Sequence, residues 1–418
     1  MRRKLLVQMC NEWRTNIWMG IELLIVSVVL FVLTDKIYTT LSTINEPLGF
    51  NAEHCYLLDV RTISEASPEY VKYADDDAAT TDLLTLLDRI KVRPEITAAA
   101  ISRNAYPYNP NSSSIQVDID TFSMADMPLL LRNIEPDFFK VFQIEGAEGE
   151  SPELLAEALK RNKALLSDNA LRGKAGIKTL KPFYGKQIVL RDNDDTLELR
   201  NTVKPVRYSD YRSAYDYDGA SVFTLITKAH YPYANEVTVR VRDNLDKDFA
   251  ETLMADADDY LRVGNWYIAS VRSFDFIGKQ YNSAPKAATR NTIVCALFLL
   301  VNIFLGILGT FWFRTRQRMK EIALRMACGA TRSDIFRRIL GEGELLLLVV
   351  TPVAVAIDYG LAHYELTTWY AGGFFEPLRF ILCILIAWGL LAIMVAVGIY
   401  FPARRGMHIN PAIALKAE

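Results

Sequence analysis

The sequence lacks the residue patterns on which most enzymes and nucleotide-binding proteins depend. Its four histidines lie in different segments without the spacing of metal ligands, and neither HExxH nor CxxC occurs, which argues against metal catalysis and leads us to expect no cofactor. The pattern G-x-x-x-x-G-K-[ST] is missing, so we expect the chain not to bind ATP by itself through a P-loop. No G-x-S-x-G element supplies a hydrolase nucleophile. We therefore expect a protein that is not itself an enzyme.

Net charge is also low, and the charges are unevenly distributed. The 418 residues have a formal net charge of −2, with 51% hydrophobic and 23% charged residues, which excludes a disordered chain and a strongly basic partner of nucleic acid. Residues 36–288 hold 30 basic and 38 acidic side chains, between two basic ends. Of the five cysteines only Cys55 lies in this acidic region, so a hydrophobic core and not a disulfide must hold it together.

Two stretches contain no charge at all. Residues 293–313 and 380–401 are 21 and 22 residues long. At ~1.5 Å per residue, each is long enough to cross a ~30 Å hydrocarbon core. The sequence therefore predicts two transmembrane helices here.

Two further spans are predicted at residues 17–33 and 339–361, although both contain acidic side chains. Glu22 lies within the first, and Glu342 and Glu344 lie at the start of the second. An acid at the centre of a span costs roughly 2.5 to 3.5 kcal/mol on insertion scales, and less near its ends. These transmembrane acids either lie near the membrane interface or act between helices.

The distribution of basic residues predicts the orientation. Residues 314–338 carry eight Lys and Arg, and Arg404 and Arg405 follow the last span, whereas residues 362–379 contain only Arg379. Because basic loops remain in the cytoplasm, we expect a multi-pass protein of the cytoplasmic (inner) membrane with both termini in the cytoplasm. No small-x-small cleavage site follows the first span, which we expect to be an uncleaved anchor. The expected parts are an N-terminal segment with helix 1 (1–35), an extracytoplasmic domain (36–288), helix 2 (289–313), a cytoplasmic linker (314–338), helix 3 (339–361), a short outer loop (362–379), helix 4 (380–401) and a cytoplasmic tail (402–418).

The middle region has the patterns of a folded α+β domain. Residues 236–243 alternate valine with polar residues, as in a strand with one buried face. Asp246 is placed to cap the helix that follows, and Ser151 before Pro152 predicts the start of another helix. Further strands are predicted at residues 115–120, 187–190 and 266–274. The predicted fold class is an α-helical membrane protein with four transmembrane helices and a large extracytoplasmic α+β domain between helices one and two.

The cytoplasmic linker predicts a helical elbow. Its apolar residues recur at steps of three and four: Met319, Ile322, Ala323 and Met326. Glu321 and Arg325 add an i to i+4 pair, Gly329 is placed to end the helix, and Thr331 can cap the next helix together with Asp334. From these residues alone, the elbow either anchors a span to anionic lipid or forms a shaped contact with a partner.

The linker and the tail resemble a known family. The linker reads Glu321-Ile-Ala-Leu-Arg325-Met-Ala-Cys-Gly329-Ala-Thr331-Arg332, followed by Ile335 and an acid at Glu342 or Glu344. It resembles the E-I-x-x-R-x-x-x-G-A-T/S signature of MacB/FtsX-type ABC transporter permeases. Pro402-Ala-Arg-Arg405 and Asn410-Pro-Ala-Ile-Ala-Leu415-Lys resemble the closing motifs of that family. Segments beginning at Glu135 and Ala164 are more loosely similar to its extracytoplasmic, MacB-like core domain.

The resemblance implies partners and contact residues. In that family the helix after the second span is a coupling helix that docks on an ATPase, and two permeases pair. The expected partners are therefore an ABC-type P-loop ATPase subunit, a second permease copy or related permease, and membrane lipid. MacB carries its ATPase on the same chain, whereas here only 16 residues precede the first span, so we expect the ATPase on another chain. The implied ATPase-coupling residues are Arg318, Glu321, Ile322, Arg325, Gly329, Ala330, Thr331 and Arg332.

Two classes of function remain at this point. The leading hypothesis is the permease subunit of an ATP-driven transporter that transmits ATPase motion to its extracytoplasmic domain for export or efflux. The alternative is a membrane-anchored sensor or scaffold that regulates an extracytoplasmic enzyme without an ATPase. Four alternatives stay open within the leading hypothesis: transport of peptides, of hydrophobic drugs or of lipoproteins, and control of a cell-wall hydrolase.

Overall fold

The computed structural model describes residues 13–73, 76–123, 128–171, 177, 179–191, 195–216, 219–228, 230–233, 236–364, 366 and 375–407. The chain divides into two compact units. The first, the helical unit, comprises Met1–Leu41, Ala287–Trp369 and Gly373–Glu418, and the second, the α/β unit, comprises Ser42–Lys286 with Tyr370–Gly372. The tail motif predicted at residues 410–416 lies outside the described residues.

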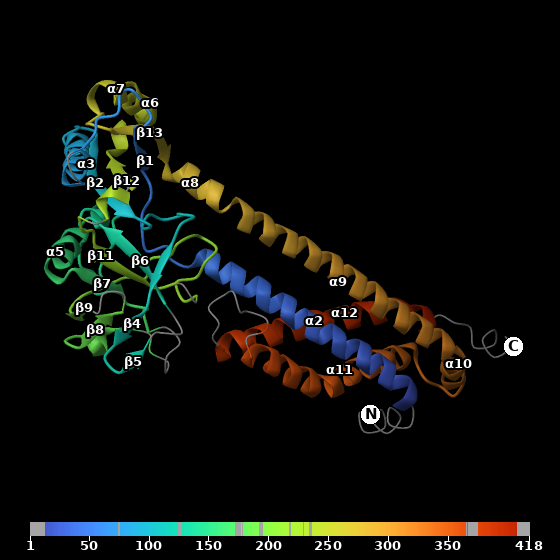
Figure 1. Ribbon diagram of the computed structural model, residues 1–418. Helices are drawn as coiled ribbons and strands as arrows, with labels where there is room; N and C mark the ends of the chain where they lie inside the picture. The colour runs from blue at the N-terminus through green and yellow to red at the C-terminus, as the bar shows by residue number, and fades with distance from the viewer. Residues whose placement is uncertain are drawn as a thin grey trace. The chain divides into compact units, whose positions relative to one another are not determined.

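The helical unit consists of long apolar helices and one short amphipathic helix (Figure 1). Among the residues described, four helices are long and apolar enough to cross a membrane, and they contain the four predicted spans. Each helix extends beyond the span predicted from its apolar residues. The helices are α2 (Trp13–Asn45), α9 (Ser283–Gln317), α10 (Met319–Ala327), α11 (Arg332–His363) and α12 (Pro377–Met407).

The long helices share one apolar core. Phe31 of α2, Leu347 of α11 and Leu391 of α12 are almost completely buried in it. Gly343 permits the close approach of α11 to α12, since a Cβ at this position would run into the side chain of Ile399. Figure 1 shows α11 and α12 side by side, with α10 at the same end of the helical unit as the start of α2.

The α/β unit contains a large mixed sheet and a smaller antiparallel sheet. The nine-stranded sheet has the order β10-β7-β11-β6-β2-β12-β1-β13, with β3 paired to β6, and the four-stranded sheet has the order β5-β4-β8-β9. Most pairs are antiparallel, whereas β11 pairs with β6, and β10 with β7, in parallel. The strands are β1 (Cys55–Thr62), β2 (Ile96–Arg103), β3 (Ser113–Ile115), β4 (Val117–Ile119), β5 (Phe122–Ser123), β6 (Leu129–Ile134), β7 (Ala164–Ser167), β8 (Gln187–Leu190), β9 (Asp195–Glu198), β10 (Thr202–Val203), β11 (Ser221–Leu225), β12 (Glu236–Val241) and β13 (Trp266–Ser273).

Helices cover both faces of the large sheet. Leu57 and Ala100 belong to a core with α4 and α5, whereas Leu58 and Ala99, their neighbours along β1 and β2, belong to a second core with α3 and α6. This alternation follows from the two-residue repeat of a strand. The helices are α3 (Asp76–Lys91), α4 (Phe138–Val141), α5 (Pro152–Asn162), α6 (Phe249–Ala255), α7 (Ala257–Tyr260) and α8 (Phe274–Tyr281), with short 3₁₀ turns at Lys181–Phe183, Tyr231–Tyr233 and Asp243–Leu245.

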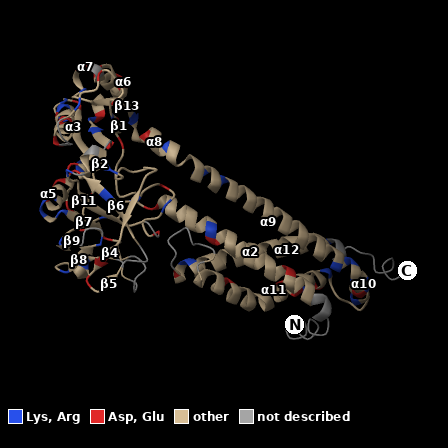
Figure 2. Ribbon diagram, viewed as in Figure 1, with Lys and Arg blue, Asp and Glu red and all other residues tan. Residues whose placement is uncertain are grey.

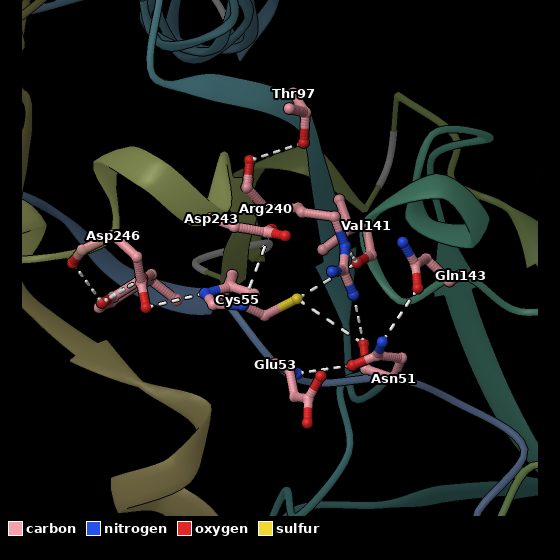
Figure 3. Close-up of polar contacts among 11 residues, drawn as sticks. Asn51, Glu53, Cys55, Thr97, Val141, Gln143, Arg240, Asp243 and Asp246 are labelled. Atoms are coloured by element: carbon pink, nitrogen blue, oxygen red, sulfur yellow. Dashed lines mark hydrogen bonds and ion pairs between the residues drawn. The ribbon is translucent and has the colours of Figure 1, made fainter.

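The expectation that residues 236–243 bury only one face is wrong. All six residues of β12 are buried, because this strand lies between β1 and β2 under two layers of helices. Its polar side chains have hydrogen-bond partners. Arg240 donates to the carbonyls of Val141 and Asn51, at 2.6 Å each (Figure 3). Thr238 donates to the carbonyl of Ala100, and the Glu236 carboxylate accepts four hydrogen bonds. Arg240 thereby joins the large sheet to α4 and to the loop before β1.

Two local predictions also differ from the structure. Asp246 does not cap a helix, because α6 begins only at Phe249; its carboxylate instead accepts a hydrogen bond from Tyr56 Oη at 2.7 Å and lies 2.9 Å from His54 Nδ1. The strand predicted at 115–120 is split, since β3 pairs with β6 in the large sheet and β4 pairs with β8 in the small one. The predicted strands 187–190 and 266–274 and the helix start at Ser151 are confirmed.

Candidate functional site

The elbow begins where α10 stops, and a glycine permits the stop. Gly329 has φ +97°, a left-handed conformation that L side chains rarely adopt. The N–H of Ala330 bonds to the carbonyl of Arg325 at 3.0 Å, and the N–H of Gly329 to that of Met326 at 3.1 Å. This pair of bonds is a Schellman motif, which satisfies the last carbonyls of a helix. The predicted helix end at Gly329 is therefore confirmed.

The next helix starts two residues later with a capping box. Thr331 Oγ1 accepts from the N–H of Asp334 at 3.2 Å, and the Asp334 carboxylate accepts from the N–H of Thr331 at 3.1 Å. The predicted cap is confirmed. Because both helix ends are satisfied locally, α10 and α11 are separated by only four residues, and the elbow has a defined shape.

One face of α10 packs inward and the other is exposed. Ile322 and Ala323 are buried, whereas Leu324 is 57% exposed. Glu321 and Arg325 form the predicted pair, with Arg325 Nη2 donating to Glu321 Oε1 at 2.7 Å. The exposed face is composed of Lys320, Leu324, Ala327 and Cys328. This face therefore presents one large apolar side chain beside a lysine.

Glu342 links α11 to the start of α10. Its carboxylate accepts from Arg318 Nη1 at 2.6 Å and lies 3.5 Å from Arg338 Nε, with a side chain only 13% exposed. Glu344 is exposed on α11. Of the two acids that the sequence left open, Glu342 is therefore the one that contacts the elbow. Arg318 lies at the junction of α9 and α10, while Ala330 is half-buried and Thr331 and Arg332 are exposed.

Glu22 contacts a neighbouring helix. Its carboxylate accepts from Thr310 Oγ1, which joins α2 to α9 at 3.1 Å. The single hydroxyl hydrogen of Thr310 is shared between this carboxylate and the Gly306 carbonyl, one turn earlier in α9. This contact is consistent with the predicted role between helices, and the position of Glu22 relative to the membrane interface stays a prediction.

Three features of the helical unit were not predicted. Arg338 belongs to the Glu342 cluster, and Leu324 lies on the exposed face of α10. Arg379, assigned by sequence to the outer loop, lies inside α12 and pairs with the buried Asp35 of α2 at 3.3 Å. No local pattern marks this last pair, since the two residues are far apart in the chain.

The charge distribution gives the elbow its character. Lys and Arg are concentrated around α10 and the adjoining ends of α9 and α11 (Figure 2). The arrangement offers no nucleophile positioned by a base and therefore no obvious chemistry. What it offers is a rigidly capped helix with an exposed apolar residue and a basic surround, which suits contact and not catalysis.

Comparisons with known proteins point to the same part of the chain. Residues 293–411 match the family model described as FtsX-like permease C-terminal. The pyoverdine export ATP-binding/permease protein PvdT of Pseudomonas savastanoi pv. phaseolicola is 27% identical over 219 residues, which cover 50% of this chain and 30% of that protein.

Two MacB proteins give similar matches. The macrolide export ATP-binding/permease protein MacB of Syntrophobacter fumaroxidans is 30% identical over 161 residues, 38% of this chain and 22% of that protein. MacB of Escherichia coli is 24% identical over 187 residues, 45% of this chain and 28% of that protein. The chain thus matches less than a third of the length of these curated relatives. Taken together with the four apolar helices, these matches indicate a multi-pass membrane protein whose residues 293–411 match the FtsX-like permease family and which is similar to MacB-type ABC transporter permeases.

Proposed function

We propose that this chain is the permease subunit of an ATP-driven exporter and that α10 is the coupling helix that docks on a P-loop ATPase carried by a partner chain. The observation that carries the proposal is the exposed face of α10, where Leu324 is 57% exposed between Lys320 and Cys328. The Schellman end and the capping box fix the direction in which α10 leaves the elbow, which suits a docking helix.

The proposed topology places the elbow in the cytoplasm of an inner-membrane protein. Residues 314–338 carry eight basic side chains, and basic loops favour the cytoplasmic side. With four spans, the α/β unit between α2 and α9 is then extracytoplasmic. A second permease copy, or a related permease, completes the transporter in this proposal.

The proposed task is mechanical. ATPase closure would move α10, and the movement would pass through the membrane helices to the extracytoplasmic domain. The names of the relatives assign export of pyoverdine and of macrolides to those proteins together with ATP binding. For this chain we propose export or efflux as the class of transport.

Co-purification tests the proposal. The full chain, extracted from its native membrane in mild detergent, should retain a P-loop ATPase that mass spectrometry identifies. Three variants should lose it while still reaching the membrane: Leu324→Ser, Arg325→Glu and Gly329→Val. Arg325→Glu replaces an attractive i to i+4 pair with a repulsive one, worth only about 0.5 kcal/mol to the helix. A complete loss of the ATPase would therefore have to arise at the dock.

The matched control is Lys36→Glu, a charge reversal at an exposed position of α2 outside residues 314–338. It should retain the ATPase as the wild type does. If no ATPase accompanies the wild-type chain, or if all three docking variants retain it, the anchored sensor or scaffold replaces the permease proposal.

A further inference from the structure

One acidic side chain of α11 lies in the core of the helical unit. Asp358 is only 1% exposed, whereas the next residue, Tyr359, is 47% exposed. The residues one turn before and one turn after it, Ala354 and Ala362, are also buried. Asp358 therefore lies on the apolar face that α11 turns toward the other helices, in line with two alanines.

The carboxyl group of Asp358 has no partner that could balance a charge. Its Oδ1 atom is buried without a hydrogen bond among the residues that the structure describes. Within the same part of the chain, no Lys, Arg or His forms an ion pair with it. By contrast, the buried Asp35 of α2 pairs with Arg379 at 3.3 Å. The two acids are buried alike, and only Asp35 has a counter-charge.

Burial without a partner favours the neutral form of Asp358. An ionised carboxylate in this position would lose the hydrogen bonds of water and gain no cation, which costs far more free energy than the burial of an uncharged polar group. A carboxylic acid avoids most of this cost by keeping its proton. Ionisable side chains inside membrane helices are for this reason candidates for the binding of ions or protons.

The other ionisable groups at the level of Asp358 make their contacts elsewhere. Tyr359 packs against Phe380 of α12, and Phe380 packs against Phe31 of α2, with ring centroids 5.9 and 5.6 Å apart. Besides Tyr359, the ionisable side chains near these rings are Asp35 and Tyr38 of α2, His363 of α11, and Arg379 and Cys383 of α12. Asp35 contacts both Arg379 and Cys383, while His363 is exposed and stacks on Tyr359. Asp358 takes no part in these contacts.

The helix that carries Asp358 contains a weak point close to it. Pro352 lies inside α11 and has no N–H to donate to the carbonyl one turn earlier, so the helix bends more easily here. Asp358 lies six residues after Pro352 and three residues before the end of the predicted span at residue 361. A movement of the short segment after Pro352 away from the core would bring the carboxyl group into contact with water.

We infer that Asp358 is a proton-binding site in the membrane part of the chain. While α11 is packed in the core, Asp358 carries its proton, and it releases this proton to water when residues 353–363 leave the core. Release of the proton and movement of the segment are coupled, because each favours the other. The inference does not depend on the proposed ATPase dock.

Labelling of the full chain in detergent with dicyclohexylcarbodiimide tests the site. This apolar reagent takes up the proton of a carboxylic acid, the carboxylate adds to its central carbon, and the adduct rearranges to a stable N-acylurea where water is excluded. Mass spectrometry of the digested protein should find the adduct at Asp358 and not at Asp35, which is ionised in its pair with Arg379. Labelling should fall as the pH is raised, and Asp358→Asn should abolish it.

Hydrogen exchange measures the coupled movement. The amides of residues 353–363 are compared between the wild type and Asp358→Asn at the same pH, so that intrinsic exchange rates cancel. Where Asp358 is labelled, the two proteins should exchange equally, because an amide resembles the neutral acid. At higher pH the wild type should exchange faster, by up to about tenfold per pH unit. The matched control is His363→Gln, which removes the exposed histidine of the same helix and should keep the pH dependence of the wild type.

Four results would overturn the inference. Asp358 could stay unlabelled, or Asp35 could be labelled equally. Sodium chloride could prevent the labelling where choline chloride does not, which would assign the site to a metal cation in place of a proton. The wild type and Asp358→Asn could exchange alike at every pH, which would refute the coupling to α11. Aggregation of Asp358→Asn would also contradict the inference, since an amide should replace a neutral acid without loss of folding.

Discussion

Removing one partner of the buried pair of Asp35 and Arg379 should destabilise the helical unit more than replacing both partners does. Arg379 Nε lies 3.3 Å from Asp35 Oδ1, and their side chains are 10% and 2% exposed. Coulomb's law at this distance and an effective dielectric of about 20 gives an attraction of about 5 kcal/mol. Withdrawing both charges from water costs several kcal/mol for each ion, so the net contribution of the intact pair is small.

The two single replacements, Asp35→Leu and Arg379→Met, each remove one member of this ion pair and leave the other charge buried, and Asp35 keeps its contact with Cys383 Sγ at 3.7 Å. We expect each to destabilise the helical unit by about 3 to 5 kcal/mol. The double variant removes both charges and should lie within about 1 kcal/mol of the wild type. The control is Lys36→Met, which removes an exposed charge from the neighbouring position and should change little.

The assay is the fraction of full chain that remains monodisperse in detergent after heating, measured by size-exclusion chromatography. Each single variant should lose half of its monodisperse protein roughly 10 °C below the wild type, and the double variant should recover most of this difference. If the double variant is as unstable as the sum of the two singles, the charges do not interact and the packing of α2 against α12 depends on apolar contacts alone.

Three further predictions concern single positions. Glu236→Gln should destabilise the α/β unit by about 3 kcal/mol, seen as faster proteolysis, because its carboxylate accepts four hydrogen bonds and an amide can accept only some of them. At Gly329 no atom lies within 4 Å of an added Cβ, so Gly329→Ala should destabilise the elbow only by the backbone strain of about 1 to 2 kcal/mol, and Gly329→Asn by less. Retention of the ATPase should therefore decrease from the wild type to Gly329→Asn and further to Gly329→Ala. A membrane-impermeant maleimide should label the exposed Cys328 only in inside-out vesicles, and a cysteine introduced at the exposed Val92 only in intact cells. Cys55 should stay unlabelled, because burial raises the pKa of its thiol to about 12.

The elbow could be predicted from sequence because the rules that form it are local. A glycine after an amphipathic run, followed by Thr331 and an acid three residues later, specifies a helix end and a helix start within six residues. The bonds at Gly329 and between Thr331 and Asp334 are the ones that these rules require. The long uncharged runs predicted the spans for a similar reason, since the length of a helix sets the thickness that it crosses.

The buried charges could not be predicted in the same way. Arg132 is completely buried and donates to Ser221 and to two main-chain carbonyls of distant loops, and burial lowers its pKa to about 10. Arg240 has the same kind of environment, and it falsified the prediction that β12 has one solvent-exposed face. In both cases the partners are backbone oxygens brought together by the fold, and a sequence carries no local signal for them.

Polar contacts connect the long helices of the helical unit to one another. In lipid, apolar packing gives a helix little preference for one neighbour over another, so hydrogen bonds and ion pairs contribute to pairing and register. Here Glu22 with Thr310 joins α2 to α9, Asp35 with Arg379 joins α2 to α12, and Arg318 with Glu342 joins the α9–α10 junction to α11. A displacement of α10 therefore acts on α9 and α11 together, because moving one without the other breaks a largely buried ion pair. If α10 is the dock that we propose, this coupling would pass its displacement to several helices at once.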